Sequence, residues 1–248
     1  VYKRQGVRYS ITHPQSYLDS NLKGFGNILE ACRQKKIQHL IFASSSSVYG
    51  MNTNIPFSTR DVTDFPISLY AATKKSNEVM ALSYSHLYDM PITGLRFFTV
   101  YGPFGRPDMA YFKFTEAILK NKKIDVFNNG EMKRDFTYID DVIESISKII
   151  SKPPKNSSIP HTKITPKYKM YNVGNNNPVS LMSFIKIIEQ ECQKNADINF
   201  LPMQSGDVIE TYANIDDLKS DFDYSPSTPV SEGINKFVRW YKRYKDME

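Results

Sequence analysis

Hydrophobic residues in the first hundred positions follow two alternating patterns. Over 16–36 and 68–89 they recur every three or four residues, a spacing that predicts two amphipathic helices. Over 39–44 and 92–98 they form short continuous runs, which are typical of strands buried on both faces. Helix, strand, helix and strand follow one another with short connections. This order predicts an α/β fold with a parallel sheet covered by helices.

The second half of the chain has shorter predicted elements. Lys152–Lys169 is rich in Pro, Lys, Ser and Thr, so we expect a surface loop there. On either side of this loop the patterns indicate helices over 109–121, 140–151, 180–193 and 230–245 and strands over 124–127, 135–138, 170–173 and 198–202.

Composition narrows the class of protein. The 248 residues are 40% hydrophobic and 13% aromatic, which is typical of a globular chain with a sizeable core. No run approaches the ~18 apolar residues that a membrane-spanning helix needs. Cys32, Cys192 and the four histidines show no metal-ligand spacing, so we expect no metal and a reducing, cytoplasmic compartment. The net charge of +6 comes from lysine pairs spread along the chain, which favours a small anionic substrate over nucleic acid.

The strongest chemical signal joins the first predicted strand to the second predicted helix. The strand ends in the hydroxyl-rich segment Ser44–Ser47, and Tyr70 and Lys74 follow four residues apart on one helix face. An ammonium and a hydroxyl donor beside a phenol both favour the phenolate, which is a usable base. Tyrosine and lysine at this spacing also occur by chance on many helices, and it is the serine cluster that favours a catalytic role.

The sequence lacks a glycine-rich turn that a dinucleotide-binding sheet would contain. A parallel sheet that binds a dinucleotide normally begins with a strand followed by a turn of this kind. The nearest match, Gly24-Phe25-Gly26, falls inside a predicted helix and has Leu29 where a third glycine belongs. We therefore interpret the chain as an N-terminally truncated fragment that lacks roughly the first βαβαβ half of the sheet.

Longer strings carry a family resemblance. The most specific are Gly94–Ala110 (GLRFFTVYGPFGRPDMA) and Met132–Asp141 (MKRDFTYIDD). The chain resembles the extended short-chain dehydrogenase/reductases, specifically the NAD-dependent nucleotide-sugar epimerases and dehydratases, and is most similar to the UDP-glucuronate 4-epimerases. The resemblance covers nearly the whole chain from Gly6, whereas Val1–Gln5 look foreign to the family. It implies a Rossmann-type parallel sheet with a smaller α/β substrate-binding domain.

The resemblance implies a role for each residue of the chemical signal. Tyr70 would take the proton of the sugar 4-hydroxyl while a hydride leaves C4 for NAD. Lys74 would lower the pKa of Tyr70 and bind the nicotinamide ribose, and Ser45 would hydrogen-bond the reacting oxygen. Asn21 resembles the family asparagine near the cofactor, and its alternative role is to cap or bridge helices.

Ser46 and Ser47 distinguish between the reactions of the family. Members that dehydrate or decarboxylate the sugar carry an acidic residue here, and this chain has none. Without a carboxyl group to act on C5 or C6, plain 4-epimerisation of UDP-glucuronate to UDP-galacturonate is favoured, as a step in polysaccharide precursor synthesis. The alternatives are a decarboxylase or dehydratase of the same family and a non-catalytic nucleotide-sugar-binding module.

The same resemblance assigns the substrate contacts. Thr99 replaces the asparagine of many relatives that act on neutral sugars, which resembles the uronate-specific branch. Arg106 would hold a carboxylate or a phosphate bidentately, and the sequence leaves open which. The nucleotide would be bound by the diphosphate clamp Arg134, by the ribose acceptor Asp207 and, at uracil, by backbone groups or ring area of Val126 and Phe127.

The division of the chain is also implied. Residues 1–98 would form a partial NAD-binding domain to which 135–174 returns, while 99–134 and 175–248 would bind the nucleotide sugar. On its own, such a fragment is expected neither to retain NAD nor to epimerise.

A homodimer is the expected assembly. Helices 16–36 and 68–89 would pair with those of a second copy, since apolar positions such as Leu82, Tyr84 and Leu87 are otherwise hard to place.

Overall fold

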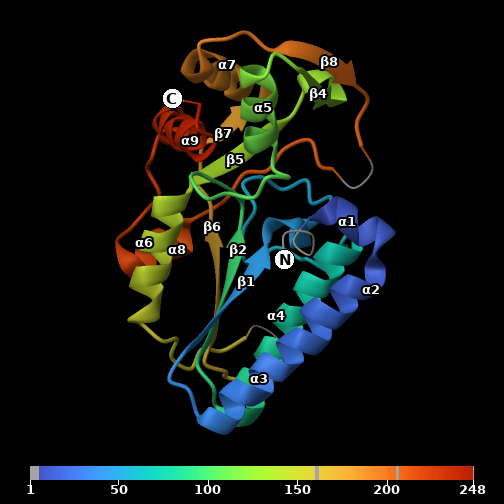
Figure 1. The fold of residues 1–248 in the computed structure, drawn as a ribbon. Coiled ribbons are helices and arrows are strands. Elements are labelled where there is room, and N and C mark those ends of the chain that lie inside the picture. Colours follow the sequence, from blue (N-terminus) through green and yellow to red (C-terminus); the bar gives the residue numbers. More distant parts are fainter. Residues whose placement is uncertain (1–5, 160–161, 205–206, 248) are drawn as a thin grey trace.

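The computed structural model describes residues 6–159, 162–204 and 207–247, so Val1–Gln5 lie outside the described residues. At its centre is a parallel sheet with the strand order β1-β2-β6 (Figure 1). β1 (Leu40–Ser45) pairs with β2 (Ile92–Phe97), and β2 pairs with β6 (Tyr168–Val173). The parallel sheet predicted from the apolar runs is confirmed.

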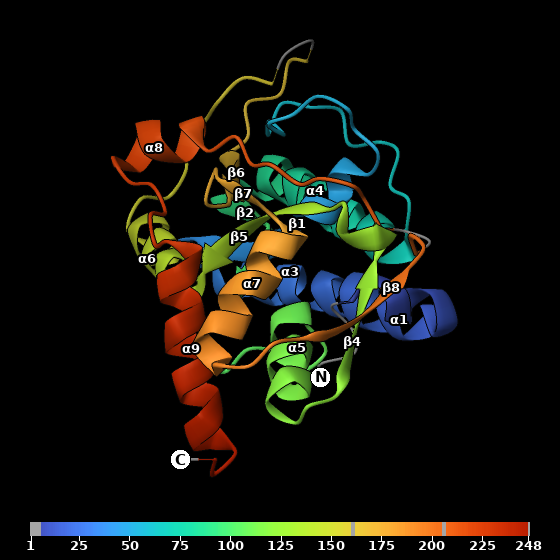
Figure 2. The ribbon, with the colours of Figure 1, turned by 90° about the horizontal axis from the view of Figure 1, so that it is seen from above.

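One face of this sheet is covered by the two long predicted helices. α2 (Pro14–Tyr17), the π-helical turn η2 (Leu18–Lys23) and α3 (Gly24–Lys35) form one continuous helical run. This run lies side by side with α4 (Leu69–Tyr88) in both views (Figures 1 and 2). Between the helices and the sheet lies an apolar cluster that includes Leu29, Phe42, Ala81, Met90 and Ile92.

The opposite face is covered by α6 (Ile139–Ile150) and α8 (Asp216–Phe222), as Figure 1 shows. A second apolar cluster fills this side and includes Val48, Leu95, Val142, Ile149, Val173 and Leu218. Both faces of the sheet are therefore buried, which explains why its strands read as continuous apolar runs.

The remaining helices and strands after β2 form a smaller α/β unit beyond the carboxyl ends of the sheet (Figure 1). Its helices are α5 (Ala110–Leu119), α7 (Leu181–Cys192) and α9 (Val230–Tyr244). Its strands are β3 (Thr99–Tyr101), β4 (Lys123–Phe127), β5 (Lys133–Tyr138), β7 (Pro178–Ser180) and β8 (Asp197–Leu201), in the sheets β3-β5-β7 and β4-β8. Phe136 and Phe184 stack in its core with ring centroids 4.0 Å apart.

The structure adds elements that the sequence patterns do not predict. These are α1 (Val7–Thr12), the 3₁₀ turns η3 (Ser46–Tyr49) and η4 (Asn128–Gly130), the strands β3 and β7, and α8. The helices and turns among them have at most seven residues, about two turns of helix, and the two strands have three residues each, so their local patterns are weak. In the part of the chain that the structure describes, no helix has the length and apolar character needed to cross a membrane.

Candidate active site

The carboxyl end of β1 and the first turn of α4 face each other. Ser45 ends β1 and caps η3 by accepting the Ser47 N–H at 3.2 Å. α4 begins after Ser68, whose hydroxyl accepts the Ala71 N–H at 3.1 Å. These two caps fix where the strand ends and where the helix begins, at the edge where parallel sheets bind ligands.

Tyr70 lies in this first turn of α4 and is 8% exposed. The Ser45 hydroxyl lies near enough to its phenol to act on its pKa, which it lowers, and Ser45 Oγ donates to Ser47 Oγ at 3.1 Å. The Tyr70 N–H donates to Ser10 Oγ at 3.3 Å, and the ring of Tyr17 packs edge-on against it with centroids 6.1 Å apart. The structure thus brings Tyr70 and Ser45 together, as the sequence predicts.

Lys74 lies one turn further along α4, and its ammonium donates to the Ala43 carbonyl at 2.9 Å. Burial lowers the pKa of Lys74. Burial also raises the pKa of Tyr70, against smaller opposing effects of the Ser45 hydrogen bond and the charge of Arg106. The pKa of Tyr70 is thus raised, opposite to the lowered pKa that the sequence predicts, and the contribution of Lys74 stays a prediction. Desolvation of the phenol dominates, and the ammonium is directed to a backbone carbonyl.

Asn21 bridges two helices. It lies in η2, and its side chain donates to Thr73 Oγ1 at 3.0 Å, while its own carbonyl accepts from Asn77 at 2.6 Å. Thr73 Oγ1 in turn donates to the Tyr70 carbonyl at 2.8 Å. The sequence left two roles open for Asn21. The structure shows that it bridges two helices, and its contact with the cofactor stays a prediction.

Arg106 points toward the same end of the sheet. Its guanidinium donates to Asp108 twice, from Nε at 3.0 Å and from Nη2 at 2.7 Å. A Cβ placed on Gly6 would lie 3.6 Å from Arg106 Nη2, so Gly6 lies beside this pair. Because the charge of Arg106 acts on the pKa of Tyr70, the guanidinium belongs to the Tyr70 end of the site. Thr99, in β3, is half-buried.

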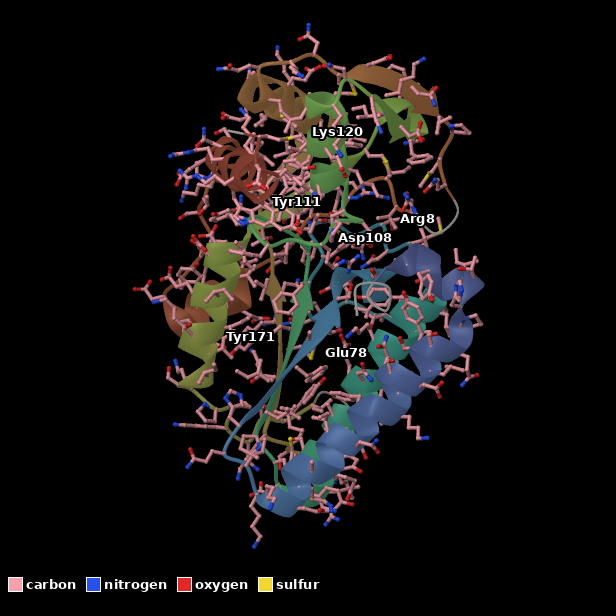
Figure 3. The ribbon with its side chains drawn as sticks, viewed as in Figure 1. Arg8, Glu78, Asp108, Tyr111, Lys120 and Tyr171 are labelled. Carbon is pink, nitrogen blue, oxygen red and sulfur yellow. The ribbon has the colours of Figure 1, made fainter. Side chains whose placement is uncertain are left out.

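The residues assigned to the nucleotide gather farther out, around the end of β4. Arg134 donates to the carbonyls of Val208 at 2.7 Å and Ile209 at 3.0 Å. Asp207 forms an ion pair with Arg8 at 3.3 Å. The guanidinium of Arg8 lies 5.1 Å from the centre of the Phe127 ring. Figure 3 shows Arg8 and Asp108 on the same side of the molecule, between α1 and the smaller α/β unit.

Val126 and Phe127, the residues assigned to uracil, end β4. The Val126 side chain is fully buried in the core of the smaller unit, so this residue can offer a ligand its backbone only. Side chains alternate along β4, so Phe127 is the half-exposed neighbour and the one with ring area to offer. Only the backbone of Val126 remains available for a base.

Four residues around the site were not predicted from the sequence. Arg8 and Tyr17 come from the segment that precedes α3, and Glu78 and Arg96 form a buried ion pair beneath Ser44. The spacing Tyr70, Lys74, Glu78 places three polar residues on one face of α4, and this periodicity could have identified Glu78.

Comparison with known proteins gives concordant matches. The sequence model of the NAD dependent epimerase/dehydratase family matches residues 2–174. Protein CapI of Staphylococcus aureus is 58% identical over 96% of this chain and 73% of its own length. A probable UDP-glucuronate 4-epimerase of Rhizobium meliloti is 47% identical over 95% of this chain and 71% of its own length.

A solved structure agrees with these sequence matches. The crystal structure of UDP-glucuronic acid 4-epimerase from Bacillus cereus, in complex with UDP-glucuronic acid and NAD, superposes with a TM-score of 0.86. The two chains are 32% identical, over 96% of this chain and 73% of the other. None of these comparisons supports the expectation that residues 1–248 are inactive on their own.

Proposed function

This chain belongs to the NAD dependent epimerase/dehydratase family, and from that premise we propose that it converts UDP-glucuronate to UDP-galacturonate by 4-epimerisation. The observation that carries the proposal is the buried phenol of Tyr70, which lies beside the Ser45 hydroxyl, with Lys74 one turn away on α4. Ser46 and Ser47 follow Ser45, so the polar side chains at this point are hydroxyls and not carboxyls. Relatives named as UDP-glucuronate 4-epimerases support the choice of sugar.

NAD is the cofactor of this family, and when bound it takes a hydride from C4 of the sugar and returns it to the other face. The donor set of the site fits its nicotinamide end. The Lys74 ammonium has three N–H donors and uses one on Ala43, so two can bind ribose hydroxyls. Gly24 and Gly26 lie within α3, away from any strand-to-helix turn, which agrees with the interpretation that they bind no pyrophosphate.

Tyr70 and Ser45 have different roles at the 4-hydroxyl of the sugar. Tyr70 accepts the proton of the 4-hydroxyl and later returns one to the same oxygen. Ser45 donates a hydrogen bond to that oxygen and holds it within reach of the phenol. Tyr70 and Ser45 are each 8% exposed, so the approach of the substrate removes the little water that reaches them and strengthens both contacts.

The division between cofactor and nucleotide sugar stays a proposal. The half with β1, β2 and β6 carries Tyr70 and Lys74, and the smaller α/β unit carries Phe127 and Arg134, with Asp207 beside them. A UDP group would lie between the two halves, with Arg134 at its diphosphate and Asp207 at its ribose. The two unpaired cysteines support a reducing, cytoplasmic compartment, where nucleotide sugars serve polysaccharide synthesis.

The proposal is tested by incubating the purified protein with NAD and UDP-glucuronate and following the sugar by proton NMR. Appearance of UDP-galacturonate supports it. Conversion of UDP-glucose but not of the uronate would reject the substrate, and release of CO2 as the main outcome would favour a decarboxylase. Binding of the sugar nucleotide without turnover would favour the non-catalytic module.

We expect Ser45→Ala to move the pH dependence of kcat/KM to higher pH. The Ser45 hydrogen bond lowers the pKa of Tyr70, so its loss raises that pKa and the base ionises later as pH rises. Initial rates between pH 6 and pH 10 measure the change. Ser76→Ala is the matched control on α4, since the Ser76 hydroxyl donates only to the Ala72 carbonyl. An unchanged pH profile in Ser45→Ala would reject the proposal that Ser45 hydrogen-bonds the reacting oxygen.

Arg106 is proposed to hold the C6 carboxylate, because its charge reaches Tyr70 at the sugar end of the site. We expect Arg106→Gln to weaken binding of UDP-glucuronate by ~10–100-fold, the range of a charge-assisted hydrogen bond, and to leave binding of UDP-glucose within a few-fold. Titration calorimetry with both ligands separates the two roles left open by the sequence. An equal loss for both sugars would assign Arg106 to the diphosphate.

A homodimer through α3 and α4 is also proposed. Ile28, Val79 and Leu87 are 53%, 55% and 64% exposed on these helices, whereas Leu82 and Tyr84 are partly buried within the subunit. We expect Val79→Glu combined with Leu87→Glu to be monomeric by light scattering, because a dimer would bury both charges. Ile143→Glu on α6, where Ile143 is 54% exposed, should leave the dimer intact. A monomeric wild-type protein would overturn the proposal.

A further inference from the structure

A buried ion pair joins α4 to the sheet directly beneath the candidate active site. Arg96 of β2 donates to Glu78 of α4 twice, from Nε to Oε1 and from Nη2 to Oε2, both at 2.9 Å. Their side chains are 5% and 6% exposed. Two parallel N–H···O bonds between planar groups fix orientation as well as distance.

The same pair is tied to the serine cluster. Ser44, the neighbour of Ser45, donates from Oγ to Glu78 Oε1 at 2.5 Å. On the other side, Arg96 Nη1 donates to Tyr49 Oη at 3.0 Å, and Tyr49 donates to Asn172 Oδ1 at 2.6 Å. Glu78 is therefore connected with β1, β2, η3 and β6, and Figure 3 shows it on α4 facing β1.

The position of Glu78 on its helix gives this connection a consequence for the site. Tyr70, Lys74 and Glu78 are four residues apart in turn and lie on one face of α4. Because two hydrogen bonds from Arg96 hold Glu78, α4 can neither rotate about its axis nor slide along the sheet without breaking them. Ser44 carries the same constraint to Ser45 through a single peptide bond.

Stability alone does not account for such a pair. Removing two charges from water is costly, and well-packed apolar residues of similar volume commonly stabilise a core as well or better. What an ion pair adds is a defined geometry. Here that geometry lies between the two elements that supply Tyr70 and Ser45.

We propose that Glu78 and Arg96 are positioning residues, which hold α4 against β1 in the register that brings the Tyr70 phenol to the Ser45 hydroxyl. The inference rests on the proposed epimerase function, in which that contact holds the reacting oxygen. Neither residue touches the sugar; both act through Tyr70.

The central experiment replaces the pair with apolar residues, as Glu78→Leu combined with Arg96→Met. We expect the melting temperature to stay near that of the wild type and kcat to fall on the order of 10²-fold, the cost of a small misplacement of reacting groups. KM for the sugar nucleotide should change little, because Arg134 and Asp207 are in the other half. Arg96→Lys, which keeps the charge, should recover part of the kcat that Arg96→Met loses.

A second readout needs neither cofactor nor turnover. Tyrosine labelled with ¹³C at the ring Cζ reports ionisation of Tyr70 by NMR, and Tyr70→Phe identifies its signal. The phenol is faced by Arg106 from the loop before α5 and by Tyr17 from α2, and Lys74 follows one turn along α4 with its ammonium on the Ala43 carbonyl. The double variant changes none of these three groups. Loss of the Ser45 contact should therefore move the titration of Tyr70 to higher pH.

Ile149→Ala is the control for simple loss of stability, since Ile149 is fully buried in α6 away from the site. It should lower the melting temperature and leave kcat and the Tyr70 titration unchanged. A double variant with wild-type kcat and wild-type Tyr70 titration would overturn the inference, and so would a kcat loss of equal size in Ile149→Ala. If the wild type shows no epimerisation, the proposed function fails, while the titration still tests the positioning. If the double variant does not fold, Glu78→Gln, which keeps one acceptor oxygen, takes its place in both measurements.

Discussion

Tyr70→Phe should reduce kcat by about 10²–10⁴-fold, the usual contribution of a general acid–base group. The substitution removes one oxygen and leaves the ring, which packs edge-on against Tyr17. Binding of the sugar nucleotide should therefore be nearly unchanged, and the loss should appear in kcat rather than in KM.

Tyr224→Phe provides the matched control for this substitution. It also removes a phenol that donates a hydrogen bond, here to the Asp141 carbonyl at 3.0 Å, but on the far side of the sheet. Steady-state kinetics of the two variants with UDP-glucuronate decide the matter. Full activity in Tyr70→Phe would exclude the phenol as the base.

Asp135→Ala should destabilise the protein by about 3 kcal/mol or more, since it strands buried N–H donors that each cost about 1–3 kcal/mol. Asp135 is 0% exposed and follows Arg134 in β5. Its two oxygens accept the N–H groups of Asn175 at 2.7 Å, Asn176 at 3.1 Å and Ala213 at 2.9 Å. One carboxylate thus holds two loops that are distant in the sequence.

Urea denaturation followed by circular dichroism measures this change. Asp125→Ala is the matched control, because Asp125 is exposed on β4 and accepts from Asn199 at 2.9 Å. Its loss should change the free energy of unfolding by about 0.5 kcal/mol or less. A similarly small effect in Asp135→Ala would mean that water replaces the lost oxygens.

The sequence predicts the parts of this fold that rest on long patterns. α4 and β1 were found within one residue of their ends, because twenty helical positions and a continuous apolar run leave few alternatives. α1, with six residues, and β3 and β7, with three each, depend on contacts with distant segments. No local pattern records such contacts.

The candidate site shows the same division. Tyr70 and Ser45 could be paired because a strand end and a helix start are both visible in sequence. The ion pair between Arg8 and Asp207 spans 199 positions and has no local signal. The sequence predicts a lowered pKa for Tyr70, whereas burial raises it. Sequence spacing indicates which charged groups are near the phenol but not how far the phenol is removed from water.

The π-helical turn η2 has a consequence for the phase of the helix that contains it. Tyr17 and Leu29, on either side of η2, are both 0% exposed. Twelve steps of an uninterrupted α-helix would place them roughly 120° apart around the axis, and a turn that absorbs one extra residue reduces this to about 20°. The run therefore keeps a single inward face only by containing one residue more than an α-helix would use. A relative with one residue fewer in this stretch could therefore form a regular α-helix that keeps the same inward face. The missing residue would come from the turn that contains Asn21.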